Sequence, residues 1–98
     1  MKVLQTQDIK VGKKSILCLS LKLNKKFLIV LRGDKGYVMC GYLSMKVANK
    51  FADSAVKVKG VSTIKDALDA KVYSLSQEAK KIGIKRNQRI KDVIKIIA

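Results

Sequence analysis

Apolar and other side chains alternate with a period of two over most of the first forty residues, which is the spacing of a β-strand. The clearest alternation runs from Ile16 to Leu23, where four leucines point to one side and Ile16, Cys18, Ser20 and Lys22 point to the other. Turn-forming sequences separate this segment from its neighbours, at residues 10–13, 24–26 and 33–36. The pattern predicts four strands in an antiparallel meander.

The run of five apolar residues from Phe27 to Leu31 breaks this alternation. Neither face of such a strand suits water, so both faces need to be covered. The chain's own helices can cover one face, but 98 residues leave little to cover the other. We therefore expect copies of the chain to associate through the N-terminal sheet, as a homo-oligomer.

After Leu43 the apolar spacing becomes helical and alternates with short strand-like segments. Ser44, Thr63 and Ser76 stand where N-caps are expected, and Gly83 stands where the third helix should end. The expected first helix has an apolar stripe of Met45, Ala48, Phe51 and Ala52. The expected last helix has an apolar stripe of Ile90, Val93, Ile94 and Ile97. The expected strands lie at Ala55–Lys59 and Lys71–Leu75.

The resulting order, β-β-β-β-α-β-α-β-α-α, predicts an α+β fold. We expect an N-terminal antiparallel β-meander over residues 1–43, which is also the oligomerisation region, and a mixed α/β part over residues 44–98. The two parts should share a mixed sheet with the helices packed on one face. A chain of this length can bury one core, so residues 1–98 are expected to form a single domain.

The chain is strongly basic, with 22 Lys and Arg residues against 7 Asp and Glu residues and a net charge of +15. One explanation is an acidic partner such as nucleic acid, which a basic surface attracts. The other is a general preference for lysine on a solvated surface. Alternate turns of a meander share one end of the sheet, so the best anion-facing cluster comprises Lys10, Lys13, Lys14 and Lys35, beside Arg32.

Neither a membrane span nor a secretory signal is expected, because the longest apolar run has five residues and Met1–Asp8 lacks an extended apolar core. Cys18 and Cys40 fall on the second and fourth expected strands, about 9.6 Å apart, which is too far for a disulfide. Both thiols should therefore stay reduced. These features predict a cytoplasmic protein.

Several kinds of chemistry are excluded or unsupported by the composition. The chain has no histidine, so Ser/His and Cys/His dyads cannot form within it. The two cysteines lack the paired spacing of a zinc site, and the carboxylates are scattered among lysines. Glycine-rich nucleotide-binding motifs do not occur. We expect no metal and no cofactor.

Cys40 is the candidate nucleophile, because it lies between a strand and the start of a helix, where a thiol can have a lowered pKa. The alternative is a structural role, since unpaired cysteines are often buried. Tyr37 and Tyr42 flank this thiol, either as ligand contacts or as interface and core residues. The expected ligand site comprises Arg32, Gly36, Tyr37, Cys40, Gly41 and Tyr42. The Gly33–Gly36 segment is either an anion-binding nest or a plain hairpin turn.

A series of short motifs resembles the YunC-like family, a domain of unknown function found in archaea and bacteria. The matching residues are Gly36-Tyr37, Met39-Cys40-Gly41, Leu43, Gly60-Val61, Thr63-Ile64, Leu68-Asp69-Ala70 and Gly83-Ile84. The resemblance implies a compact α+β domain whose N-terminal strands form an oligomerisation region, with a tetramer as the expected assembly. It implies no activity.

Three hypotheses follow from the sequence. The leading one is a small cytosolic homo-oligomeric domain that binds a small ligand near Cys40 at a subunit boundary. The second is a basic protein associated with nucleic acid through its lysines. The third is a thiol enzyme that uses Cys40, although a binding domain is favoured over an enzyme.

Overall fold

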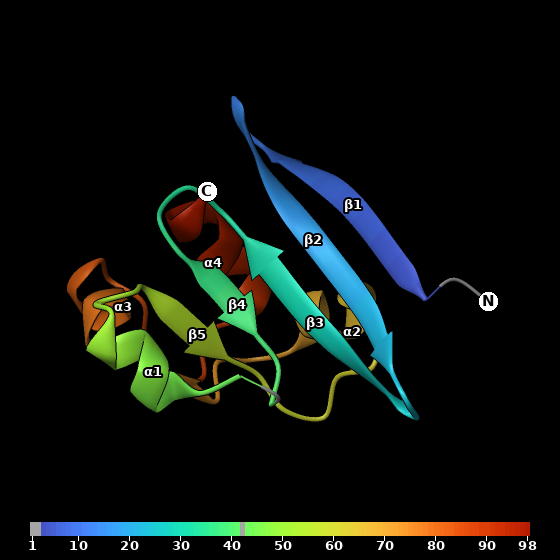
Figure 1. Cartoon of the computed structure of the whole chain (residues 1–98). Coiled ribbons are helices and arrows are strands. Elements are labelled where there is room, and N and C mark those ends of the chain that lie inside the picture. The colour runs from blue at the N-terminus through green and yellow to red at the C-terminus, as the bar shows by residue number, and fades with distance from the viewer. Residues whose placement is uncertain (1–2, 42) are drawn as a thin grey trace.

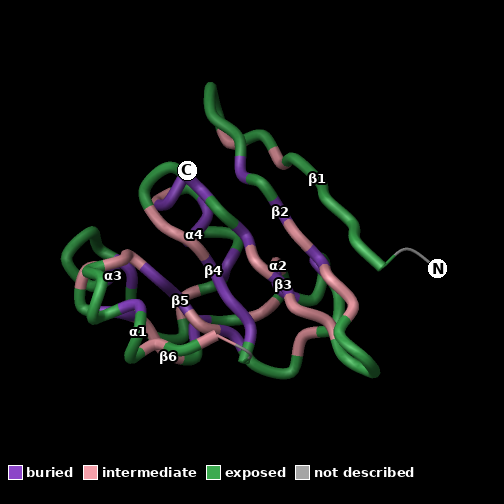
Figure 2. The backbone as a smooth tube through the Cα atoms, viewed as in Figure 1, coloured by how far each residue is buried: buried purple, intermediate pink, exposed green. Residues whose placement is uncertain are grey.

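The computed structural model describes residues 3–41 and 43–98. Its strands form a six-stranded sheet in the order β1-β2-β3-β4-β5-β6. Figure 1 labels β1 to β5, and Figure 2 also labels β6. The strands are β1 Leu4–Val11, β2 Lys14–Leu23, β3 Lys26–Arg32, β4 Tyr37–Met39, β5 Ala55–Lys57 and β6 Ser74–Leu75. The helices are α1 Met45–Lys50, α2 Ile64–Asp69, α3 Gln77–Lys81 and α4 Ile90–Ile97.

The sheet is mixed, as the sequence predicts. Strands β1 to β4 are antiparallel neighbours, β4 pairs with β5 in parallel, and β5 pairs with β6 antiparallel. The parallel pair follows from α1, because a helix between two strands returns the chain to the same end of the sheet. The α+β fold class and the N-terminal meander are therefore confirmed.

One face of the sheet carries the larger core. Ile16 and Cys18 of β2 lie on this face, and Cys18 is directly opposite Leu31 of β3. Helices α2 and α4 pack against it, and Val93 and Ile97 of α4 are fully buried. Burial of this apolar stripe is the main force that holds α4 on the sheet.

The opposite face is covered only in part. Helix α1 covers the β4–β5 end through a small cluster of Met39, Ala48 and Ala55. It therefore lies on the other side of the sheet from α2 and α4, whereas we had expected the helices on one face. Over β1, β2 and β3 the apolar side chains of this face stay partly exposed, and β1 is exposed along most of its length (Figure 2).

We call this partly exposed area the leucine surface, which consists of two exposed residues, Leu4 and Leu17, and four half-buried ones, Leu19, Leu21, Leu28 and Val30. Its members face one another across the strands, since Leu19 is opposite Val30 and Leu21 is opposite Leu28. Leu17 keeps 43% of its surface exposed. The alternation around Ile16–Leu23 was thus predicted correctly, and the leucines occupy the face that none of the helices described in residues 3–41 and 43–98 covers there.

The local helix signals agree with the structure, but several element ends differ: among them, the strand expected at Ala55–Lys59 ends at Lys57. Ser44, Thr63 and Ser76 are N-caps whose side chains accept the expected backbone hydrogen bonds. Helix α1 ends at Lys50, so Phe51 is exposed instead of continuing the apolar stripe. The expected strand at residues 71–75 is shortened to β6, preceded by a bridge between Lys71 and Arg89.

Within residues 3–41 and 43–98, no helix has the length and apolar character that a membrane crossing requires.

Candidate functional site

Strand β4 separates the residues that the sequence places in one ligand site. Arg32, Gly36 and Tyr37 lie around a hollow at its first residue, whereas Cys40 and Gly41 lie beside a different pocket just after its last residue. Three strand residues span about 10 Å, so these two groups do not meet. Tyr42 lies outside the described residues.

The pocket beside Cys40 has a volume of about 470 Å³. Three segments form it: the turn into β3, the residues after β4, and the loop from β5 to α2. We call it the Cys40 pocket, and its lining residues are Lys25, Lys26, Phe27, Cys40, Gly41, Gly60, Val61 and Ser62.

Hydrogen bonds donated by backbone amides hold the walls of this pocket in place. The Cys40 amide donates to the Ile29 carbonyl at 3.2 Å, and the Ile29 amide donates to the Cys40 sulfur at 3.4 Å. On the opposite wall, the Ser62 amide donates to the Asp66 carboxylate at 3.1 Å, and the Asp66 amide donates to the Thr63 hydroxyl at 3.0 Å. This near-capping box fixes the loop that leads into α2.

The Cys40 thiol is packed into the sheet. Only 4% of the residue is exposed, and its sulfur lies 4.0 Å from the Phe27 carbonyl oxygen as well as accepting from Ile29. These contacts are with backbone atoms, so they hold the sulfur as part of the pocket wall. Cys18 is also unpaired, and burial, with a smaller effect of Asp8, raises the pKa of its thiol.

The charge and polarity of the Cys40 pocket suit an anion that carries an apolar group. Lys25 and Lys26 lie at its rim, and its lining residues include no carboxylate. Phe27 and Val61 supply apolar wall and pack against the larger core. A lysine ammonium can bind a phosphate or carboxylate as a point charge while the apolar wall accepts a ring or alkyl chain.

The hollow at the other end of β4 has a volume of about 310 Å³. Two amides of its Gly33–Gly36 turn are already hydrogen-bonded within the protein. The Gly33 amide donates to the Gly36 carbonyl and the Lys35 amide donates to the Ile97 carbonyl, each at 2.8 Å. These amides therefore close the hairpin turn and bind the last turn of α4, and they are not available to an anion as an anion-binding nest requires.

Tyr37 in this hollow is engaged by Asp53. Its hydroxyl donates to a carboxylate oxygen of Asp53 at 2.9 Å. Burial, this hydrogen bond and the negative charge of the carboxylate raise the pKa of Tyr37 to about 12. Tyr37 is thus a partner of Asp53 at this end of β4, away from the Cys40 pocket.

The expected anion-facing cluster is located at one end of the sheet, where the β1–β2 and β3–β4 turns approach each other. The Lys14 ammonium lies 3.5 Å from the Asp34 carboxylate, which establishes this proximity. Lys10, Lys13 and Lys35 are close in sequence to this ion pair, and all three are exposed. The negative charge of Asp34 cancels part of the positive charge of the four lysines.

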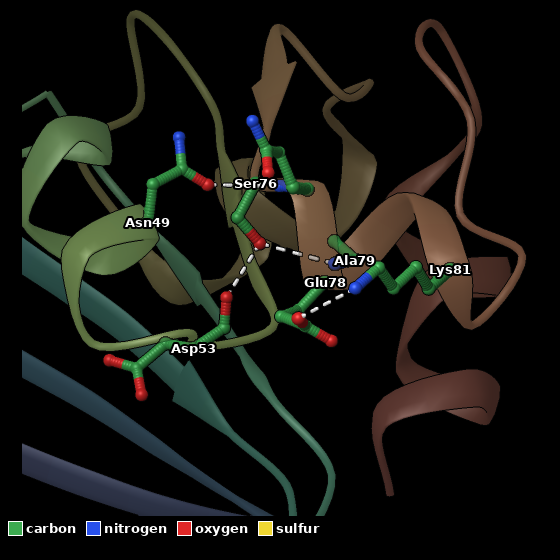
Figure 3. Close-up of polar contacts among 7 residues, drawn as sticks. Asn49, Asp53, Ser76, Glu78, Ala79 and Lys81 are labelled. Carbon is green, nitrogen blue, oxygen red and sulfur yellow. Dashed lines mark hydrogen bonds and ion pairs between the residues drawn. The ribbon is translucent and has the colours of Figure 1, made fainter.

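A polar network joins α1 and the segment that follows it to the start of α3 (Figure 3), and Ala55 of β5 also takes part. The buried Ser76 hydroxyl accepts from the amides of Ala55 and Ala79 at 2.9 and 3.2 Å and donates to the Asp53 carbonyl at 2.7 Å. The Asn49 side chain accepts from the Gln77 amide at 2.9 Å. These contacts make a rigid joint whose hydrogen bonds satisfy the first turn of α3.

Sequence reasoning missed two groups of residues. Lys25, Lys26 and Phe27 line the Cys40 pocket, yet they were assigned only to a turn and a strand. Tyr73 was not singled out, although Lys59 lies over its ring and Arg86 bonds its carbonyl. The alternating pattern around Lys59 and Tyr73 was the available signal for a basic, aromatic surface.

Across the described parts of the chain, no group of three or more His, Cys, Asp and Glu residues is arranged to hold a metal ion.

Comparisons with known proteins give the same fold and no activity. Residues 39–97 match the model of a family described as "Domain of unknown function (DUF1805)". The uncharacterized protein YunC of Bacillus subtilis (strain 168) is 34% identical over 70 residues, which cover 67% of this chain and 69% of that protein. A crystal structure of a protein of unknown function from Thermoplasma acidophilum has a TM-score of 0.92 and 41% sequence identity, covering 97% of this chain and 93% of that one.

Proposed function

The chain belongs to the DUF1805 family, and we propose that it is a small homo-oligomeric domain of the cytoplasm that binds a small anionic ligand in the Cys40 pocket. The family carries no assigned activity, so the proposal is built on the pocket itself. Two unpaired, buried cysteines support the cytoplasmic placement, because reducing compartments keep thiols free.

One observation carries the ligand proposal: a pocket of about 470 Å³ has two lysines at its rim, apolar side chains on its wall and no lining carboxylate. That volume is within the range of small-molecule sites. The ligand class is therefore a phosphate or carboxylate attached to a ring or a short apolar chain. The Cys40 thiol takes no chemical step in this proposal, because its sulfur is bound to the backbone.

We place the ligand within one subunit rather than at a subunit boundary. Phe27 and Cys40 belong to the side of the sheet that packs against the larger core. The leucine surface lies on the opposite side. Association through the leucine surface would therefore leave the Cys40 pocket uncovered.

The support for homo-oligomerisation is the leucine surface itself. It is an apolar area centred on β2 and β3, with Leu4 of β1 beside it and with Thr6, Asp8 and Arg32 at its margin on the same face, and apolar areas that stay exposed mark interaction sites on a protein. A second copy of the chain offers a matching surface. The YunC-like resemblance favours a tetramer as the final assembly.

The ligand proposal is tested with phenyl phosphate, which combines a ring with a dianion. Titration of ¹⁵N-labelled protein should shift the backbone amide signals of Gly41, Gly60 and Ser62. Inorganic phosphate should bind more weakly, because it leaves the apolar wall unused.

The matched variants are Lys25→Glu with Lys26→Glu, and Lys10→Glu with Lys13→Glu as the control of equal charge change. The pocket pair should bind phenyl phosphate at least about tenfold more weakly, since a charge-assisted hydrogen bond contributes about 1.5 to 3 kcal/mol. The control pair should bind as the wild type does. Equal losses in both pairs, or shifts confined to residues outside the pocket, would refute the proposal.

A further inference from the structure

Three backbone segments lie side by side at the β6 edge of the sheet. The Tyr73 amide donates to the Lys57 carbonyl at 2.9 Å, which joins the segment before β6 to the end of β5. The Val72 amide donates to the Gln88 carbonyl at 2.9 Å, which joins the same segment to the residues before α4. Val58, Val72 and Ile90 are buried, so the inner side of these segments belongs to the core.

The other side of these segments carries an exposed aromatic ring among basic residues. Tyr73 keeps 46% of its surface exposed. The Lys59 ammonium lies 4.1 Å from the centroid of its ring, and the Arg86 guanidinium donates to its carbonyl at 3.2 Å. Lys71 faces Arg89 across an antiparallel bridge. We call this the Tyr73 surface, comprising Lys59, Lys71, Tyr73, Arg86 and Arg89.

The Tyr73 surface is free of carboxylates in its own segments, because residues 57–61, 71–75 and 84–90 contain no Asp or Glu. The neighbouring Asp69 carboxylate is already paired with the Lys91 ammonium at 3.0 Å. Its pKa is lowered by that hydrogen bond and ion pair, and further by Lys65 and Arg89. In the anion-facing cluster of Lys10, Lys13, Lys14 and Lys35, by contrast, the Asp34 carboxylate lies 3.5 Å from the Lys14 ammonium.

We propose that the Tyr73 surface binds single-stranded nucleic acid: the Lys59 ammonium exchanges its place over the Tyr73 ring for a phosphate, a base stacks on the ring, and Arg86 and Arg89 hold the neighbouring phosphates. Single-strand binders combine an aromatic stacking platform with a positively charged track for the backbone. The surface offers both, and it holds two of the chain's three arginines, the residue suited to bidentate phosphate contacts. A duplex keeps its bases stacked internally and cannot use the ring in this way.

The Tyr73 surface and the Cys40 pocket share no residue, although Lys59 directly precedes Gly60 of the pocket. The residues of the surface come from the segments that follow β5, precede β6 and precede α4, whereas those of the pocket come from the turn into β3, the end of β4 and the loop between β5 and α2. Different variants therefore test the two proposals, at Lys59, Tyr73 and Arg89 for nucleic acid and at Lys25 and Lys26 for phenyl phosphate.

The test is fluorescence anisotropy with a labelled oligouridylate at about 50 mM salt, where counterion release favours binding most. Tyr73→Ala should weaken binding by about 5- to 150-fold, the range for loss of one stacked base, whereas Tyr73→Phe should bind like the wild type. Replacing Lys59 and Arg89 with Gln should lower the slope of log K against log salt by about 1.4, since each single-strand phosphate contact contributes about 0.7.

The matched control replaces Lys10 and Lys13 with Gln, which removes the same charge from the other end of the molecule. It should leave both affinity and salt slope near the wild-type values. Thermal unfolding checks that each variant is folded, and amide shifts at Lys59, Tyr73 and Arg89 in the wild type locate the site without any substitution.

The proposal is overturned if the wild-type chain does not bind at about 50 mM salt. It is also overturned if the control pair loses as much affinity as the surface pair, or if a duplex binds as tightly as the single strand and Tyr73→Ala has no effect. Binding of polyglutamate in place of the oligouridylate would assign the surface to an acidic protein instead.

Discussion

Tyr37 illustrates how a neighbouring side chain decides what one residue can do. The sequence places it beside Cys40, as a possible ligand contact, but its side chain turns to Asp53 at the other end of β4. The hydroxyl is a donor in that pair, so its proton is favoured in the folded state. Its effect should therefore be seen in stability and not in ligand binding.

Replacement of Tyr37 by Phe should lower the free energy of unfolding by about 0.5 to 1.5 kcal/mol at neutral pH, the usual contribution of one hydrogen bond. The pKa of tyrosine is about 10 in an unfolded chain and that of Tyr37 is about 12 in the folded one. A raised pKa adds stability that is complete below the unfolded value and is lost as the pH rises through the folded value. The difference between wild type and Tyr37→Phe should thus shrink between about pH 10 and 12.

Urea unfolding at a series of pH values measures this difference, with Tyr73→Phe as the control for loss of an exposed tyrosine hydroxyl. The free energy of unfolding of the control should change with pH as that of the wild type does. If the wild type and Tyr37→Phe differed by the same free energy at every pH, the raised pKa of Tyr37 would be contradicted.

At the scale of elements, the sequence predicted the hydrogen bonds that form within one helix and missed those that join segments far apart in the chain. Ser44, Thr63 and Ser76 were correctly expected as N-caps, because a cap bonds its own helix three residues on. Ser76 also accepts from Ala55 and donates to Asp53, more than twenty residues away in sequence. Such contacts depend on how α1 and β5 are packed, which no local pattern encodes.

Ser76→Ala should therefore cost more than the loss of a cap alone. It leaves the buried amides of Ala55 and Ala79 without this acceptor, and each buried group left unpaired costs about 1 to 3 kcal/mol. We expect a loss of about 2 to 4 kcal/mol in the free energy of unfolding, against about 1 kcal/mol for the exposed cap variant Thr63→Ala. Urea titration of both variants measures the two losses, and equal losses would show that Ser76 acts only as a cap.

For the whole molecule, the sequence predicted the mixed sheet but could not decide which apolar face of β2 receives the helices. Ile16 and Cys18 lie under α2 and α4, whereas the leucines of β2 remain on the other side. Alternation identifies two faces but not their partners. The candidate site was predicted only in part for a related reason: residues adjacent in sequence lie at opposite ends of β4, while Lys25 and Val61 meet Cys40 from distant segments.

The leucine surface should hold copies of the chain together. Wild-type protein should elute with a mass that is a multiple of 10.9 kDa, measured by light scattering after size exclusion. Leu19→Thr with Leu21→Thr should give the single-chain mass, because two apolar contacts at the centre of the surface are replaced by residues that still favour a strand. Val47→Thr with Phe51→Thr changes an exposed apolar residue of α1 and the exposed residue that caps its end, and should keep the wild-type mass.

A single-chain mass for the wild type at all concentrations would rule out association through this surface. So would an unchanged assembly in the Leu19 and Leu21 variant.

The side of the sheet on which Phe27 and Cys40 lie also has a consequence for any such assembly. Chains joined back to back by their leucines would each turn this pocket towards the solvent, so that each copy could bind and release ligand independently of its neighbours. Saturation would then follow a simple hyperbola with one equivalent of ligand per chain, without cooperativity between the copies.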